Sequence, residues 1–194
     1  MGKSFGVNQS QFKITSLSQF YLHSDFDIIS ELSTYILKGS SKYEADDGSN
    51  DDLVAWNWGA STLPTANSEG TIPSIVCVND AAGFSIVKYT GNGSTGATIG
   101  HGLTSAPELI IVKNLTDQEN WSVYGAGNAS DNLGETKVGH LNLTALFTTS
   151  GDWNNTAPAT DVFTTGSSNR VNSNGDRFIA YCWYSILGYS KIGS

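Results

Sequence analysis

The feature that most constrains the fold is a series of short strand-like runs that occupies the chain from Leu53 to its end. These runs are rich in Val, Ile, Phe, Tyr, Trp and Thr, and Gly, Asn, Asp and Pro separate them. Many short strands with regular turn signals predict an antiparallel sandwich or barrel. We expect strands near 53–58, 72–78, 84–90, 108–113, 120–124, 136–143, 160–164 and 177–187. Their wide spacing favours a jelly roll, so the predicted class is an all-β antiparallel β-sandwich with a short N-terminal helical segment.

Two glycine-containing turns need a specific interpretation. Asn174-Gly175 lies between strand-like runs and predicts a hairpin with a primed turn. Gly91, Gly93 and Gly96 match the letters of a dinucleotide-binding fingerprint. That fingerprint requires a following helix, and only strands are predicted here, so we expect another hairpin turn.

Residues 1–45 differ from the rest and contain one predicted helix, over 24–38. Ser24 can cap its N-terminus and Gly39 can end it. Apolar residues follow at helical spacing between them, namely Phe26, Ile29, Leu32 and Ile36. A helix with one apolar stripe must dock on something, which is either the sandwich or a neighbouring subunit. We therefore divide the chain into an attachment segment, 1–45, and a sandwich domain, 46–194.

The last long strand is apolar on both faces. Ile179, Tyr181 and Trp183 alternate with a second apolar set, Phe178, Ala180, Cys182 and Tyr184. A sandwich strand with one solvated face should alternate between apolar and polar residues. We therefore expect the face of Ile179, Tyr181 and Trp183 to be covered, either by the helix at 24–38 or by another subunit. The second possibility would make the protein a homo-oligomer.

Charge and composition exclude several classes of protein. Only 14% of the residues are charged and the formal net charge is -8, without a cluster of Lys or Arg. Nucleic-acid binding requires a basic surface, so we expect none. The chain has no apolar run long enough for a membrane-spanning helix. We expect Cys77 and Cys182 to be buried thiols, because each lies inside an apolar run.

The sequence shows no catalytic or metal-binding pattern. His23, His101 and His140 have no partners at metal-ligand or catalytic spacing, and His101 in a Gly-flanked turn is expected to shape a loop. The acidic stretch at 43–52 lacks the spacing of a calcium loop, and a solvated loop is the simpler interpretation. We predict a non-enzymatic protein with no catalytic residue, metal or cofactor.

Glycan binding without catalysis is a separate hypothesis. It requires an exposed aromatic ring with amides or carboxylates beside it. Asp152, Trp153, Asn154 and Asn155 form the best candidate, and Trp121 is a second one. The alternative for Trp153 is a loop ring that folds onto the core.

Two runs far apart in the chain parallel each other. Residues 50–58 read NDDLVAWNW and residues 175–183 read GDRFIAYCW. A second echo relates Gly83-Phe84-Ser85 to Gly188-Tyr189-Ser190. Each echo combines a turn with the start or course of a strand, which suggests a section of a tandem-repeat protein. The alternative is that similar strands share a composition by chance.

Several runs together resemble a repeat domain of structural proteins from marine and cyanobacterial phages. They are 82–93, which begins AGFSIVKY, then 100–103, 107–114, 120–124, 153–158, 162–164 and 188–194. The resemblance covers about 50–194 and implies a concanavalin-like jelly roll on tail fibres or other virion proteins. Residues 1–45 look unlike that domain, which suits a short protein attached by its N-terminal segment.

From these observations we expect a bacteriophage virion protein on the tail or head exterior, assembled in the host cytoplasm. Its partners would be other virion proteins and, in the alternative, a host surface glycan. The residues expected to contact a subunit or the particle are Phe26, Ile29, Leu32, Ile36, Ile179, Tyr181 and Trp183.

Overall fold

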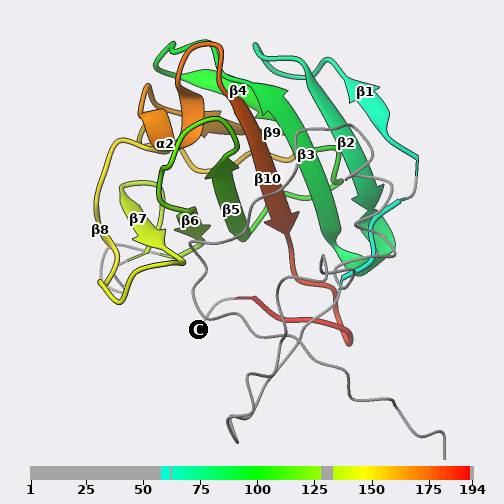
Figure 1. The fold of residues 1–194 in the computed structure, drawn as a ribbon. Helices are drawn as coiled ribbons and strands as arrows, with labels where there is room; N and C mark the ends of the chain where they lie inside the picture. Colours follow the sequence, from blue (N-terminus) through cyan, green and yellow to red (C-terminus); the bar gives the residue numbers. More distant parts are fainter. Residues whose placement is uncertain (1–57, 62, 128–132, 193–194) are drawn as a thin grey trace, which may run out of the picture.

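The computed structural model describes residues 58–61, 63–127 and 133–192. Their fold is predominantly β and antiparallel, which confirms the predicted all-β class at that level (Figure 1). The predicted helix at 24–38 and most of the predicted strand at 53–58 lie outside the described residues, as does the first run of the 50–58 echo. Trp58, the last residue of that predicted strand, is in no strand.

A large sheet forms one layer of the domain. Its eight strands lie in the order β1-β2-β3-β10-β5-β6-β7-β8, and all neighbours are antiparallel. Their bounds, in the order of the sheet, are Thr65–Asn67, Ser74–Asn79, Phe84–Thr90, Arg177–Trp183, Leu109–Asn114, Ser122–Gly125, Lys137–His140 and Thr148–Thr149. The last strand of the chain thus lies at the centre of the sheet, between β3 and β5.

A second sheet pairs β4 (Ala97–Gly100) with β9 (Val162–Thr165). The main hydrophobic core lies between the two sheets, because Ile99 and Phe163 from the small sheet pack in one cluster with Val87, Phe178 and other residues of the large sheet. Phe163 and Phe178 are fully buried. The two layers make the domain sandwich-like.

Two short, capped helical turns occur among the described residues. The 3-10 helix η2 (Asp80–Ala82) links β2 to β3 and ends at Gly83, whose φ of 64° is the left-handed conformation that glycine tolerates. The helix α2 (Asn169–Asn172) begins after Ser168, whose Oγ accepts a hydrogen bond from the Arg170 N–H. The Tyr89 hydroxyl donates to the Val171 carbonyl at 2.7 Å, which ties α2 to β3.

Both predicted hairpins are wrong. Asn174-Gly175 connects α2 to β10, and the 91–96 loop connects β3 to β4, which belongs to the other sheet. Each pattern correctly marks a tight turn, since Gly93, Gly96 and Gly175 have positive φ. Turn chemistry reports the local backbone, whereas the sheet that the next strand joins depends on distant residues.

The other local predictions have mixed outcomes. Cys77 and Cys182 are buried free thiols, as expected. The buried His101 ring contacts the Ala159 carbonyl through Nε2 at 3.2 Å and accepts from the Leu103 N–H through Nδ1, so it does shape its loop. The predicted strand at 177–187 ends at Trp183. There the chain turns away from the sheet, and the Tyr184 N–H binds the Gly83 carbonyl.

Candidate functional site

A shallow polar hollow opens where three loops meet beside the small sheet. Its volume is about 400 Å³, and it is lined by Thr95, Ser150, Gly151, Asp152, Asn154, Asn155, Gly166, Ser167, Ser168 and Arg170. Hydroxyls, amides and one guanidinium therefore face the same space. Asp152, Asn154 and Asn155, which the sequence singled out, all line it.

An ion pair forms the most ordered part of the hollow. The Asp152 side chain is 1% exposed, and its carboxylate accepts from Arg170 Nη2 at 2.7 Å and from Arg170 Nε at 3.0 Å. Ser150 Oγ donates to the same carboxylate at 2.7 Å and Ser122 Oγ at 3.0 Å. The carboxylate thus joins β6, its own loop and α2. Bidentate geometry and full hydrogen bonding are the conditions under which a buried pair is stable.

The electrostatics of the pair follow from this geometry. Burial raises the pKa of Asp152, but the hydrogen bonds from Arg170 and Ser150 and the Arg170 charge outweigh it, so the pKa is lower than usual. The hydrogen bond to Asp152 raises the pKa of Arg170. Both groups are therefore charged at neutral pH, and the pair fixes the loop at 150–156 to α2.

Two consecutive asparagines form the rim. Asn154 and Asn155 have φ values of 51° and 50°, the left-handed region that Asn tolerates better than most residues. A turn closes around them, in which the Asn154 N–H binds the Gly151 carbonyl and the Thr156 N–H binds the Trp153 carbonyl, each at 3.0 Å. Asn155 is exposed and Asn154 half-buried.

The aromatic platform that glycan binding was predicted to use is not present at the described residues. Trp153 is 1% exposed and packs edge-on against Tyr124 in the main core, with ring centroids 5.7 Å apart. Trp121 is 7% exposed. The hypothesis of an exposed ring is contradicted for both residues, and for Trp153 the alternative of a loop ring folded onto the core is confirmed. An indole in a polar loop can gain more by folding onto an adjacent core than by facing solvent. The loop therefore presents polar groups to solvent but no exposed aromatic ring.

The hollow also contains residues that the sequence did not indicate. Arg170, Ser150 and Ser168 come from segments with no recognisable motif, and α2 was not predicted. No histidine is among the described residues that line the hollow. Across the described part of the chain, no group of three or more His, Cys, Asp and Glu is placed to hold a metal ion.

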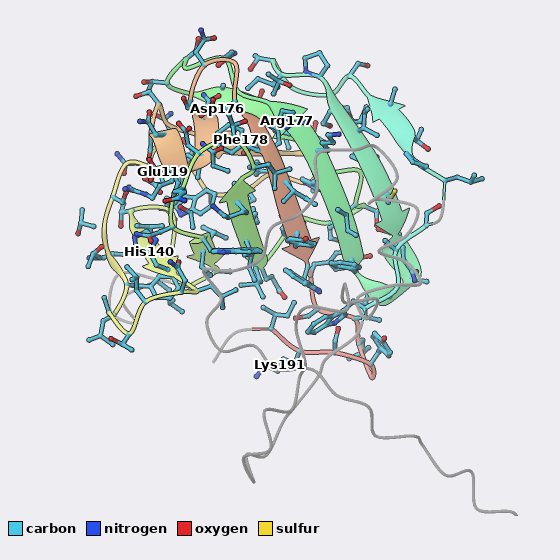
Figure 2. The ribbon with its side chains drawn as sticks, viewed as in Figure 1. Glu119, His140, Asp176, Arg177, Phe178 and Lys191 are labelled. Carbon is cyan, nitrogen blue, oxygen red and sulfur yellow. The ribbon has the colours of Figure 1, made fainter. Side chains whose placement is uncertain are left out.

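The predicted contact face is a second feature of interest. Ile179 and Trp183 are 3% and 8% exposed, and Tyr181 is half-buried. They lie on the outer face of the large sheet in a separate hydrophobic cluster with Cys77, Phe84 and Ile86. The other predicted contact residues, Phe26, Ile29, Leu32 and Ile36, lie outside the described residues. Figure 2 shows Arg177 at the start of β10 and Lys191 beyond the opposite end of that strand.

Comparison with known proteins yields one family. No curated protein and no solved structure matches the chain. None of the helices in the described residues is long and apolar enough to cross a membrane. Residues 18–194 match a family described as a domain of unknown function, DUF7483. That match includes the predicted helix and crosses the boundary we expected at 45/46. Because it spans most of the sequence, the chain belongs to the DUF7483 family.

Proposed function

We propose that this protein is a bacteriophage virion structural protein, an exterior component of the tail or head attached through its N-terminal segment. The finer fold that accompanies this proposal is a concanavalin-like jelly roll. The resemblance of residues 50–194 to repeat domains of phage structural proteins supports both. The protein would be assembled in the host cytoplasm, carry no catalytic activity and contact other virion proteins.

The structural observation that carries the proposal is a group of exposed leucines. Leu141, Leu143 and Leu146 are 43%, 47% and 83% exposed, and all lie in the connection from β7 to β8. Exposed apolar side chains that lie near one another in a loop favour contact with another macromolecule, because leaving them in water is unfavourable. An assembly protein has neighbours to bury such a loop, and we assign the loop to that contact.

The test is the presence of the chain in purified particles. Immunogold electron microscopy with an antibody against the chain should label the tail or the head, and Leu143→Ser with Leu146→Ser should lower incorporation. Thr144→Ser, an exposed substitution in the same loop, is the matched control and should leave incorporation unchanged. Particles without label, from which the chain is also absent by mass spectrometry, would refute the proposal.

Glycan binding is the second candidate, and the polar hollow favours it. Asn154, Asn155 and Ser167 supply amides and a hydroxyl to a space large enough for a sugar ring. A glycan array should then show binding by the wild-type protein that Asn155→Ala and Ser167→Ala weaken. Trp153→Ala is unsuitable, because it would open a cavity in the core. Failure of the wild-type protein to bind any glycan would end this hypothesis and leave the virion proposal untouched.

A further inference from the structure

The outer face of the large sheet has an unusual distribution of apolar residues. Neighbouring strands place Trp183 beside Phe84 and Leu109, and Tyr181 beside Ile86 and Ile111. Cys77 on β2 extends the same cluster. Ile86 and Ile179, in the middle strands, are only 1% and 3% exposed. A sheet face with this much buried apolar surface is a packed interface, and it needs a covering layer.

The described residues supply only the margin of that layer. From outside the strands, the partly buried apolar residues that pack on the cluster within 58–61, 63–127 and 133–192 are Ala60, Leu115 and Ile192, and the exposed Trp58 ring also contacts it. Among the described residues, the buried indole N–H of Trp183 has no hydrogen-bond acceptor, but the same is true of Trp153 in the inner core, so this feature does not distinguish the outer face. The almost complete burial of Ile86 and Ile179 does indicate a covering element beyond the residues at the margin.

The chain enters the described part of the structure across this face. The Trp58 ring packs edge-on against Trp183, with centroids 5.4 Å apart. Asn79 Nδ2, at the end of β2, donates to the Gly59 carbonyl at 2.9 Å. The residues that precede Trp58 are therefore tethered beside the apolar cluster. A tethered segment has a far higher effective concentration at this face than a separate molecule has.

The sequence before Trp58 contains a segment that matches the face. Residues 24–38 carry the stripe of Phe26, Ile29, Leu32 and Ile36, and the family match begins at residue 18, ahead of that stripe. Charge is also complementary. Asp25 and Asp27 lie at the start of this segment, and the face bears Lys88, Lys113 and Arg177 at the end of β10 away from Trp183.

We propose that residues 24–38 form a helix that docks its apolar stripe on the outer face of the large sheet, over Ile86, Ile179 and Trp183, within the same chain. The helix then forms a third layer of the domain and provides the cover that the two-faced strand β10 requires. This inference does not depend on the virion proposal. It leaves the other residues of the 1–45 segment to contact a particle.

The maleimide reactivity of two native cysteines can show whether the outer face of the sheet is covered. Cys77 lies in the outer cluster and Cys182 in the inner core. In the full chain, pulse labelling with a maleimide followed by peptide mass spectrometry should find both thiols protected. Ile29→Ser with Leu32→Ser should raise the labelling rate of Cys77 by about tenfold or more and leave Cys182 protected, because only the outer layer opens. Glu31→Ser with Thr34→Ser, on the opposite face of the same helix, is the control and should change neither rate.

A second measurement does not depend on opening the interface. Replacement of each stripe residue in turn by a photo-reactive diazirine analogue of leucine, followed by irradiation, should give an intramolecular cross-link to the outer face of the large sheet for at least one position. The same replacement at Thr34 should give none. Rapid labelling of Cys77 in the wild type, or the absence of a cross-link from every stripe position, would overturn the proposal. The proposal would also be overturned if the protection of Cys77 rises with protein concentration and does not change in the variant with Ile29→Ser and Leu32→Ser. That result would assign the cover to a second copy of the chain.

Discussion

The two faces of β10 differ in what completes them. The inner face, with Phe178, Ala180 and Cys182, is closed within the described residues by the small sheet and α2. Within the same part of the chain, the outer face, with Ile179, Tyr181 and Trp183, is closed only at its margin. One strand therefore serves two interfaces, of which one is complete within the sandwich and the other needs a further element. A strand that is apolar on both faces needs a cover on each, and our proposal assigns the outer cover to a third layer of the same chain rather than to a subunit contact.

The largest loss of stability should come from a substitution on the inner face of β10. Phe178 is fully buried and stacks on Tyr89, with ring centroids 5.2 Å apart. We expect Phe178→Ala to lower the free energy of unfolding by about 3–5 kcal/mol, because it removes buried contacts and leaves a cavity. Chemical denaturation measures this. A loss below about 1 kcal/mol would show that the inner core is less tightly packed than the structure indicates.

The next effect should come from the ion pair in the hollow. We expect Asp152→Asn to destabilise the protein by about 1–3 kcal/mol, below the range for fully buried pairs because Arg170 is 31% exposed. The pH dependence has a defined sign. The folded pKa of Asp152 is lowered, so its stabilisation is present at neutral pH and is lost as pH falls below about 4. Acid titration of Asp152→Asn should show less loss in that range. An equal loss in both proteins would assign the acid sensitivity to other groups.

A double-mutant cycle should show energetic coupling between the outer face of β10 and residues 24–38. If residues 24–38 cover Ile179, the effects of Ile179→Ala and Leu32→Ala on unfolding are not additive. We expect a coupling of about 1–2 kcal/mol in the double-mutant cycle. Val112→Ala, on the inner face of β5, should show none with Leu32→Ala and is the control. Additive effects of Ile179→Ala and Leu32→Ala on the free energy of unfolding would mean that residues 24–38 do not cover the outer face.

The loss of stability in acid should occur in two pH ranges, and His101 accounts for the higher one. Burial lowers its pKa, against opposing effects of the Ala159 carbonyl and nearby carboxylates. Because the folded pKa lies below the unfolded value, the unfolded chain binds the proton more readily. Stability should therefore begin to fall as pH drops below about 6.5, well before Asp152 titrates. We expect His101→Gln to flatten that part of the stability profile and leave the part below about pH 4 unchanged. An unaltered profile would mean that His101 is charged in the fold.

Some strands and one loop of the hollow could be predicted from local sequence, and the other elements could not. The strands at 84–90 and 109–114 were predicted closely, because a β-branched run bounded by turn residues specifies its own extent. The short β1, β4 and β8 were missed because their residues are polar or few and their pairing comes from neighbours. For the hollow, the loop at 152–155 was found by its composition. Arg170 was not, since it lies eighteen residues from Asp152 in sequence and only the fold brings them together.

The smallest effect concerns the rim of the hollow and tests whether it has a role beyond structure. Asn155 has a φ of 50°, so Asn155→Ala should cost about 1 kcal/mol from the left-handed conformation alone, whereas Asn155→Gly should stay within about 0.5 kcal/mol of the wild type. Thermal unfolding measures both. The two substitutions remove the same amide, so their comparison separates the backbone from the side chain. Equal loss of any glycan binding in both variants would then report the amide itself, whereas binding lost in Asn155→Ala and kept in Asn155→Gly would report only the shape of the turn.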